Sequence, residues 1–458
     1  MDKQKAVFIY KGRYTVRDTA TLEVLSALAK RSGIETGLVF DQDVFGVSDN
    51  VFYMPLLNKM LSGEGRIARK LIESDAATVV YLDNFNTRGW AERVLLAAKG
   101  KKPGLKAVCV TQYGYEGANF DYILKGEPEV VFKKFIEAGM NTGIESDELA
   151  VLDKLPLPDK ELFSKHANFG DSYLIYTGKG CKFHCSYCEE ALSGEKFGSG
   201  YFRRRSPEHV ILELADAKTR YGFNEVIFKD SIFTQDKAWL EKFLNLYNKE
   251  IAVPFKCFGK VDGFDAGTAV LLRNSGCYCV EFGVQTFNEK IRALALRRPE
   301  TNAQIFAAFS ACDRSGLRYD ADHMFGLPGE SVEDHKNAAQ IYSRCRMLNR
   351  VKCHNLVVYP DAKIGEYKHS DYIGDFFSTN NDETSMRFAN NCFRKIFKLL
   401  PILPKSMLNG NIHWAVFGAV PQLAVLAGQL LIAAIKKDIR FRIYLNYYPK
   451  KVLSILGQ

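Results

Sequence analysis

The pattern of apolar and polar residues changes its period along the chain. In the first 140 residues, short apolar runs alternate with amphipathic stretches near 18–32, 56–74 and 90–99. Four of the runs are predicted to be buried strands: Lys5–Tyr10, Glu35–Phe40, Thr78–Leu82 and Lys106–Thr111. Strands that alternate with helices form parallel, doubly wound sheets. We therefore predict an α/β domain of this class at residues 1–140, with ligands at the carboxyl ends of its strands.

A second alternation of strands and helices follows a polar, proline-punctuated linker predicted at residues 141–168. Its predicted strands are Tyr173–Tyr176, Glu225–Phe228, Phe255–Phe258, Cys279–Phe282 and Tyr319–Met324, with Val351–Tyr359 as a further one. Five or six such strand–helix units predict a partial or complete parallel barrel at residues 169–370. Barrel active sites lie at the carboxyl ends of the strands.

The last part of the chain, residues 371–458, is predicted to be helical and contains a 22-residue run without charge, Trp414–Ile435. Pro421 and two glutamines interrupt the run. We weigh three alternatives for it: a buried helix pair, which we favour, a helix docked at a membrane surface, and a membrane span. Six basic residues and one acidic residue in Lys436–Lys451 support peripheral membrane contact and, with it, a lipid-like substrate.

Composition narrows the class of protein. The 458 residues carry a net charge of +9, which is modest for this length, and no long basic run with interleaved aromatics, so nucleic acid is not a predicted partner. The eleven cysteines are dilute and odd in number, which suits a reducing cytosol rather than a disulfide framework. The start of the chain shows no signal-peptide pattern. We therefore predict a cytoplasmic protein.

Three cysteines crowd one loop after the strand Tyr173–Tyr176: Cys181, Cys185 and Cys188, in a C-x3-C-x2-C array. Such an array can bind three irons of a [4Fe–4S] cluster, whereas a closed cluster site needs four thiolates. The fourth iron would be open to a small molecule. Zinc would need a fourth ligand, and His184 lies inside the loop, where it could not easily complete a tetrahedron. We interpret the other cysteines, Cys277 and Cys279 included, as small core residues rather than a second cluster.

This array, with an aromatic residue before its last cysteine, resembles the cluster loop of the radical S-adenosylmethionine (SAM) superfamily. Further segments agree with that family in order and spacing: Tyr176–Gly180, Phe202–Pro207, Asp230–Thr234, Val284–Thr286 and Gly326–Glu330. Together they cover residues 170–365, the catalytic core of the family. The resemblance implies that SAM chelates the open iron and that one electron, from a donor such as flavodoxin or ferredoxin, cleaves it to a 5'-deoxyadenosyl radical.

The resemblance also implies cofactor-binding residues. Tyr187 is expected near the adenine of SAM, and Asp230 near its amino group. Lys260 and Gln285 are weaker candidates for its carboxylate and ribose. The turn that contains Gly326 and Pro328 would meet the adenine edge. Two alternatives stay open: Asp230 as a simple strand cap, and His323 as a core residue, which we favour over a substrate-facing acid or base.

The first domain resembles the cobalamin-binding domain of a large radical SAM subfamily, through Asp121–Glu129 and Leu155–Asp159. Many such domains ligate cobalt through the histidine of a D-x-H-x-x-G motif. Here the first histidine is His166, so cobalamin binds without histidine or the domain has lost it. The subfamily implies methyl transfer to an unactivated centre of a small or hydrophobic substrate. The alternatives are a cobalamin-independent radical SAM rearrangement or cyclisation, and a non-catalytic metal-binding scaffold.

Overall fold

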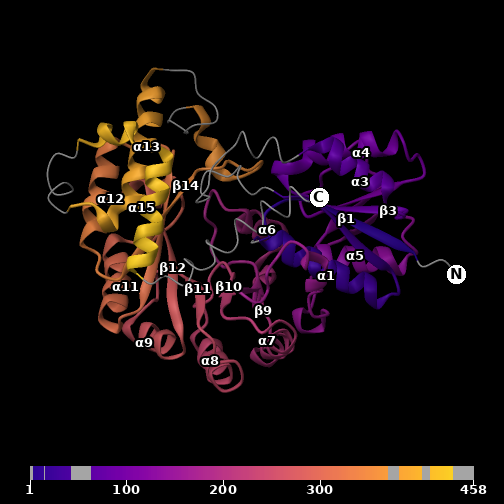
Figure 1. Ribbon diagram of the computed structural model, residues 1–458, viewed down its shortest axis with the longest axis horizontal. Coiled ribbons are helices and arrows are strands. Elements are labelled where there is room, and N and C mark those ends of the chain that lie inside the picture. The colour runs from indigo at the N-terminus through magenta and orange to yellow at the C-terminus, as the bar shows by residue number, and fades with distance from the viewer. Residues whose placement is uncertain (1–3, 15, 43–62, 370–380, 405–412, 437–458) are drawn as a thin grey trace. The chain divides into compact units, whose positions relative to one another are not determined.

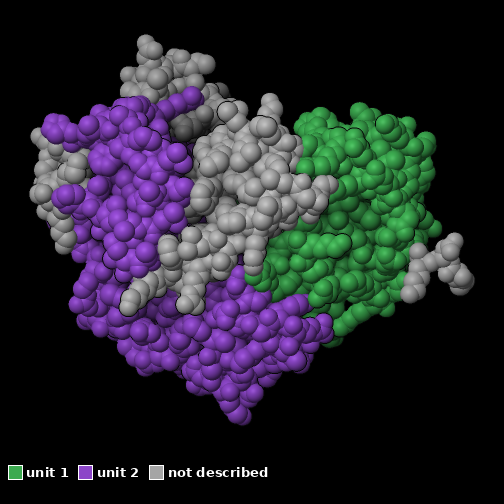
Figure 2. All heavy atoms as spheres, viewed as in Figure 1, with its two compact units in different colours: residues 1–169, 203–206, 450–458 green, residues 170–202, 207–449 purple. Residues whose placement is uncertain are grey.

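The computed structural model describes residues 4–14, 16–42, 63–369, 381–404 and 413–436. Within these residues the chain forms two compact units (Figures 1 and 2). The first unit contains residues up to 169 together with 203–206, and the second contains 170–202 and the described residues from 207 onward. This division does not separate the predicted linker or the C-terminal region, so the four predicted ranges stay predictions.

The sheet of the first unit is parallel throughout and has the strand order β2-β1-β3-β4-β5-β6. Its first five strands follow the flavodoxin-like order, which confirms the predicted doubly wound class. The four predicted strands are present, and β5 and the short β6 extend the sheet beyond them. The strands are β1 (Lys5–Gly12), β2 (Glu35–Gln42), β3 (Thr78–Leu82), β4 (Lys106–Thr111), β5 (Tyr122–Gly126) and β6 (Ile144–Ser146).

Four helices accompany this sheet: α1 (Arg17–Arg31), α3 (Glu64–Glu73), α4 (Arg88–Lys99) and α5 (Pro128–Glu137), together with the 3-10 turn η1 (Phe85–Thr87). The predicted linker forms two more 3-10 turns, η2 (Leu152–Lys154) and η3 (Lys160–Phe163). The buried Lys160 ammonium lies 2.6 Å from the Glu23 carboxylate of α1, and Ser26 donates a hydrogen bond to Asp159. This part of the linker is therefore packed onto α1 rather than forming a free tether.

The second unit is built on a parallel six-stranded sheet with the order β14-β13-β12-β11-β10-β7. In the part of the chain that is described, its edge strands β7 and β14 do not pair, so the barrel is partial. The strands are β7 (Tyr173–Ile175), β10 (Val226–Phe228), β11 (Phe255–Gly259), β12 (Cys277–Gln285), β13 (Arg318–Phe325) and β14 (Leu348–Asn355), with the short β8 (Gly178–Lys179) and β9 (Arg203–Arg204) outside the sheet. The last strand lies a few residues before its predicted position.

Helices follow most of these strands and share one apolar core with one face of the sheet. Tyr319, Ala321 and Phe325 of β13 point into that core, whereas the alternate positions Asp320 and Asp322 lie on the opposite face. The helices are α6 (Glu189–Phe197), α7 (Pro207–Tyr221), α8 (Lys237–Glu250), α9 (Ala266–Asn274), α10 (Glu289–Leu294), α11 (Asn302–Ser315) and α12 (Val332–Arg344), with 3-10 turns η4 (Ser199–Tyr201) and η5 (Lys363–His369). The inner face of the partial barrel is therefore polar.

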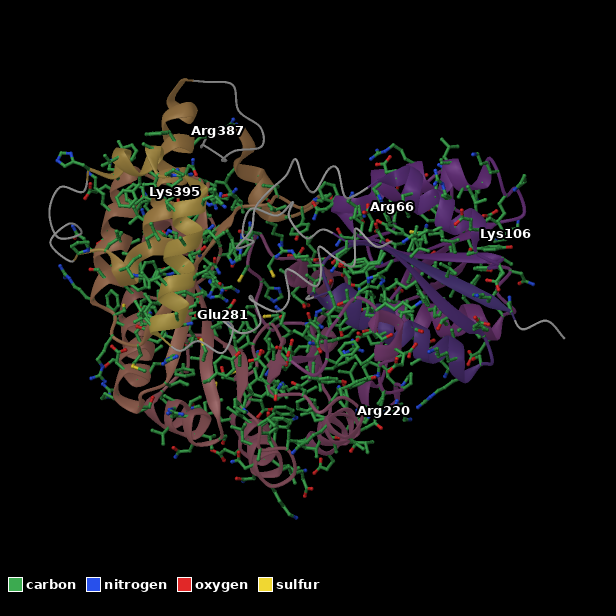
Figure 3. All side chains as sticks on the ribbon, viewed as in Figure 1. Arg66, Lys106, Arg220, Glu281, Arg387 and Lys395 are labelled. Carbon is green, nitrogen blue, oxygen red and sulfur yellow. The ribbon has the colours of Figure 1, made fainter. Side chains whose placement is uncertain are left out.

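The described C-terminal region is helical, as predicted: α13 (Asn381–Leu399), η6 (Leu400–Ile402), η7 (Trp414–Ala419) and α15 (Gln422–Ile435). Pro421 divides the long apolar run into η7 and α15. Lys395, labelled in Figure 3, donates hydrogen bonds to three carbonyls between Phe417 and Val420 and so ties this region to α13. Among the described helices, we find none with the length and apolar character that crossing a bilayer requires. Phe417 and Val425 are buried, but Leu423 is 68% exposed, so α15 buries only part of its apolar surface.

Candidate active site

The cysteine loop follows β8 and ends at Cys188, the residue directly before α6. Gly180 starts the loop with φ +81°, and a Cβ at this position would lie 2.7 Å from the Tyr201 carbonyl oxygen. Only glycine fits this backbone without strain. Cys181, Cys185 and Cys188 are all free thiols of intermediate burial.

The loop is held at its centre by Ser186. Its amide donates to the Leu296 carbonyl at 3.1 Å, and its hydroxyl donates to the Ala295 carbonyl at 2.5 Å. Its own carbonyl accepts from the Ile364 amide at 3.0 Å. The residue between the second and third cysteines is therefore fixed from two sides, which preorganises the thiols before any metal binds.

The electrostatics of the loop oppose free thiolates. Burial raises the pKa of the Cys181 thiol to about 11 and of the Cys188 thiol to about 12, and it also raises the pKa of the Cys185 thiol. Metal binding must therefore displace protons from these sulfurs.

A buried charge cluster joins the loop to the strand ends. The Lys260 ammonium lies 4.0 Å from the centroid of the Phe183 ring and 2.9 Å from the Glu300 carboxylate. Arg298 pairs with the same carboxylate at 2.7 Å and donates to the Tyr187 hydroxyl at 3.2 Å. The structure thus brings the predicted Lys260 and Tyr187 together through Glu300 and Arg298.

Sequence reasoning missed both Arg298 and Glu300. Burial alone would raise the pKa of Glu300, but the Arg298 and Lys260 charges outweigh burial and hold that pKa below its ordinary value. Arg298 also donates to the Gly283 carbonyl at 2.8 Å, at the end of β12. The signal available in the sequence was the Arg297–Glu300 segment, three charges around a proline directly after the apolar Ala293–Leu296.

Gln285, a predicted cofactor residue, ends β12 in a strained backbone. Its φ is +65°, a left-handed conformation that costs a residue with a Cβ about 1–2 kcal/mol. The residue is buried, and its Oε1 has no hydrogen-bond partner in the described structure. Gly283 makes room for the side chain, since a Cβ there would lie 2.7 Å from the Gln285 Nε2. A strained residue with an unused acceptor is suited to binding a polar ligand.

Asp230 lies two residues beyond β10, and the structure shows its capping role directly. Its Oδ1 accepts hydrogen bonds from the amide and the hydroxyl of Thr177, at 2.9 and 3.0 Å. These bonds join the carboxyl ends of β7 and β10 below the cysteine loop. Asp230 thus caps the two strand ends, and a contact with the amino group of SAM stays a prediction.

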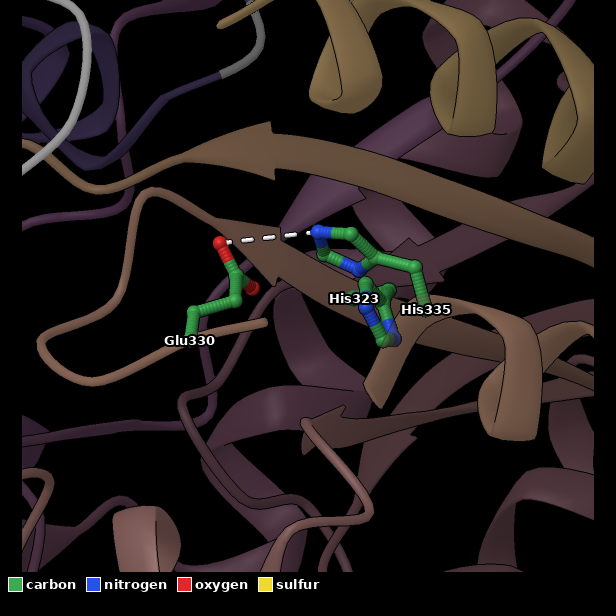
Figure 4. A group of neighbouring side chains, drawn as sticks. All are labelled: His323, Glu330 and His335. Carbon is green, nitrogen blue, oxygen red and sulfur yellow. Dashed lines mark ion pairs between the residues drawn. The ribbon is translucent and has the colours of Figure 1, made fainter. Parts of the chain in front are cut away.

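The turn after β13 contains the predicted Gly326 and Pro328, both buried. Its Glu330 accepts from the Gly326 amide at 2.8 Å and lies 3.6 Å from His335 Nε2 (Figure 4). His335 Nε2 also contacts Asn390 Oδ1 at 2.8 Å. Burial raises the pKa of Glu330 to about 8 and lowers the pKa of His335 to about 4. We interpret this group as the support of the turn.

His323 belongs to the same neighbourhood but not to the cysteine site. It is 1% exposed and lies on the face of β13 that packs against helices, edge-on to Phe325 and Phe397. Its Nδ1 lies 3.3 Å from the Tyr342 hydroxyl. The structure thus places His323 in the core, as the favoured interpretation expected, and not toward the polar face of the sheet.

Comparison with known proteins agrees with this site. Residues 175–341 match the model of the radical SAM superfamily. A protein of Pyrococcus horikoshii named as a methyltransferase is 23% identical over 271 residues, which is 54% of this chain and 58% of that protein. The cytidylyl-2-hydroxyethylphosphonate methyltransferase of Streptomyces wedmorensis is 23% identical over 43% of this chain and 40% of its own length. The matches thus span less than two thirds of either curated relative.

The fold is also shared with a solved structure. The radical SAM methyltransferase TsrM of Kitasatospora setae, determined with cobalamin and a [4Fe–4S] cluster, superposes with a TM-score of 0.57 at 13% identity. The match covers 79% of this chain and 77% of that one. It confirms the predicted fold class, a doubly wound domain followed by a partial barrel and a helical region. With the cysteine array, its anchored loop and the matching family model, residues 175–341 of the chain are a radical SAM domain.

Proposed function

We propose that this protein is a cobalamin-dependent radical SAM methyltransferase that acts on a small molecule. The observation that carries the proposal is the extent of the fold match, which reaches 79% of the chain and therefore extends beyond the radical SAM domain at 175–341. The matched protein is a methyltransferase solved with cobalamin, and the curated relatives are named as methyltransferases. Domain content and relatives thus support the same activity.

The second unit would hold the cluster and surround the reacting groups. Cys181, Cys185 and Cys188 would hold the cluster, which together with SAM supplies one-electron cleavage of a carbon–sulfur bond. The electron would come from a donor such as flavodoxin or ferredoxin. The partial barrel positions the reacting groups and keeps stray hydrogen donors away.

The predicted SAM contacts lie around this loop. Gln285 offers a buried acceptor that has no hydrogen-bond partner among the residues that the structure describes. Arg298 donates to the Tyr187 hydroxyl and so orients this ring, which would lie near the adenine. Asp230 would receive the amino group, and the turn at Gly326 and Pro328 would line the adenine edge. Lys260 forms an ion pair with Glu300 at 2.9 Å. It therefore acts by positioning the loop as much as by contacting the SAM carboxylate.

Cobalamin would bind the first unit without a histidine ligand, since residues 1–165 contain no histidine. The polar side chains at the carboxyl ends of β3 and β4 are tied to one another. Arg88 forms two hydrogen bonds to Asp83 at 2.7 and 2.8 Å, and the Thr111 hydroxyl donates to Asp83 at 2.7 Å. These side chains offer no imidazole to cobalt, so the corrin would be held by contacts at its periphery. The alternative is a cobalamin-independent radical SAM enzyme that catalyses a rearrangement or cyclisation.

Anaerobic reconstitution distinguishes the cobalamin-dependent methyltransferase from the cobalamin-independent enzyme. The purified chain is loaded with iron, sulfide and hydroxocobalamin, desalted, and examined by its absorption spectrum. A stoichiometric corrinoid band that survives desalting supports the methyltransferase. A protein that keeps the cluster and no corrinoid supports the alternative. Because cobalamin is assigned to the first unit, Cys185→Ala should lose the cluster and still retain the corrinoid.

The substrate class is polar rather than lipid-like in this proposal. The relatives are named for a cytidylyl phosphonate and for tryptophan, both small polar molecules. The exposed Leu423 and Ile435 of α15 are the observation that favours the alternative, a lipid-like substrate reached by peripheral membrane contact. Flotation with anionic liposomes tests it, since a protein that remains unbound at low salt does not use a membrane surface in this way.

A further inference from the structure

The inner face of the partial barrel carries an unusual number of charges. Strand alternation places Lys256, Glu281, Asp320, Asp322 and Lys352 on the side of the sheet opposite its helices. Glu281 is labelled on β12 in Figure 3. Buried parallel strands are ordinarily apolar on both faces. The charges on this face therefore require a reason beyond folding.

Most of these charges neutralise one another. Lys256 lies 2.5 Å from Glu281 and 2.6 Å from Asp320. Lys352 pairs with Glu281 and lies 3.8 Å from Asp322. Arg350 pairs with Asp320 at 3.0 Å, and His354 lies 3.4 Å from Asp322. The three carboxylates of this face are thus fully shared among its other basic groups.

Lys229 is the cation of this face that forms no ion pair among the described residues. It directly follows β10, and its amide donates to the Ile175 carbonyl of β7 at 2.9 Å. Its ammonium lies over the Phe258 ring, 4.9 Å from the centroid. Within the described residues no carboxylate lies within 4.0 Å of it. Counting Lys229, Lys256, Arg350 and Lys352 against Glu281, Asp320 and Asp322 leaves one excess positive charge.

The environment of Lys229 makes this excess costly. Burial, together with the positive charges of Lys352 and Lys256, lowers the pKa of Lys229 to about 8, against the opposing effect of Glu281 and Asp322. A desolvated cation without a counter-ion is expensive in any fold. The side chain still keeps some accessible surface, so a ligand can reach it. A bound anion would remove the cost.

The position of Lys229 indicates what kind of anion could bind there. It immediately precedes Asp230, at the strand ends that face the cysteine loop, but its side chain joins Phe258 on the inner face rather than the Thr177 contact that Asp230 makes. Phe258 also lies 5.8 Å from the Lys352 ammonium. A flat aromatic ring flanked by two ammonium groups suits an organic anion with some apolar surface.

We infer that Lys229 is a specificity-determining residue that binds an anionic group of the substrate, a carboxylate or a phosphonate or phosphate, on the inner face of the barrel. The inference rests on the proposed radical SAM function, because it assigns a substrate to that same site. It does not depend on cobalamin or on methyl transfer. The neighbouring Lys352 and the Phe258 ring complete the anion site.

Binding of a simple anion tests the inference directly. The full chain, with its cluster reconstituted and SAM present at saturation, is titrated with methylphosphonate, and binding is followed by 31P NMR. SAM in excess occupies the subsite for its own carboxylate. We expect saturable binding to the wild type and at least about a tenfold loss of affinity in Lys229→Met. Lys229→Arg should retain most of the affinity. The matched control is Lys237→Met, an exposed lysine of α8 that should bind as the wild type does.

Two results would overturn the inference. One is methylphosphonate binding that is absent in the wild type or equal in the wild type and Lys229→Met. The other is a loss of SAM affinity in Lys229→Met without a change in methylphosphonate binding, which would assign Lys229 to the SAM carboxylate. Failure of the proposed methyltransferase would look different: the chain would retain no corrinoid, while the anion titration would still separate the variants.

Discussion

The Lys260 ammonium lies 4.0 Å from the centroid of the Phe183 ring, and this contact joins the end of β11 to the cysteine loop. Phe183 lies between the first two cysteines, so its contact with the Lys260 ammonium helps to fix the position of the loop. That ammonium must itself be held in place by other residues. Glu300 and Arg298 do so, through ion pairs of 2.9 and 2.7 Å at one carboxylate. Cluster loop and strand ends are therefore one electrostatic unit rather than separate motifs.

Replacing Cys185 by alanine is expected to abolish the cluster, because two thiolates from one loop cannot hold three irons. Iron content and the absorption of the anaerobically reconstituted protein measure this loss, and SAM cleavage should fall with it. Cys345→Ser provides the control, since that partly buried thiol lies outside the loop and donates to the Ile341 carbonyl. A Cys185→Ala protein with full iron content and normal SAM cleavage would refute the assignment of the site.

Gln285→Gly is expected to make the protein more stable and less able to bind SAM. Glycine relieves the left-handed backbone at φ +65°, which should raise the free energy of unfolding by about 1 kcal/mol. The same change removes the buried acceptor, which has no other partner in the described residues. Denaturant unfolding and equilibrium dialysis with SAM measure the two effects.

Ala252→Gly is the matched control for Gln285→Gly, since Ala252 has φ +53° at the end of α8. It should gain stability without any change in SAM affinity. If Gln285→Gly binds SAM as the wild type does, the strain at this position serves packing alone.

The strand–helix alternation and the spacing of three cysteines predicted both sheets and the cluster loop. Local periodicity reports burial on a strand, and Cys181, Cys185 and Cys188 are close in sequence. The Arg298–Glu300–Lys260 cluster could not be found in this way, because Lys260 follows β11 whereas Arg298 and Glu300 precede α11, and no spacing rule connects the two segments. The same is true of Lys160, whose partner Glu23 lies 137 residues earlier. The apolar run at Trp414–Ile435 was ambiguous because length and hydropathy do not say what a helix packs against.

Lys256→Met is expected to destabilise the second unit strongly. The Lys256 side chain is 6% exposed and forms ion pairs with both Glu281 and Asp320. Its loss therefore removes one positive partner from each of these two buried carboxylates. Breaking a buried pair costs about 3–5 kcal/mol. We expect the lower end of that range, since Lys352 and Arg350 still pair with these carboxylates.

Urea unfolding compares Lys256→Met with Lys237→Met. Lys237 forms a pair of similar length with Asp265, 2.6 Å, but both side chains are more than half exposed. Such surface pairs contribute about 0–1 kcal/mol. Equal losses in the two variants would show that the inner-face network does not behave as a buried one.

The last prediction concerns the dependence of stability on pH at Lys229. Burial and the Lys352 and Lys256 charges lower its pKa in the folded protein to about 8, below the ordinary value of 10.5. Between these two pH values the unfolded chain binds more protons than the folded one, so this lysine makes stability rise with pH across the window. Below pH 8 the folded protein bears the full cost of a charged Lys229, at most about 3 kcal/mol. Lys229→Met should therefore be more stable than the wild type at pH 7, and the difference should shrink as pH approaches 10.5.

Thermal or urea unfolding of both proteins at a series of pH values checks this, with Lys237→Met as the control for loss of a lysine. A difference that is constant with pH, or a less stable variant at every pH, would contradict it. A lysine that weakens the free protein at neutral pH is retained for what it binds, and the substrate anion is the group that would offset its cost.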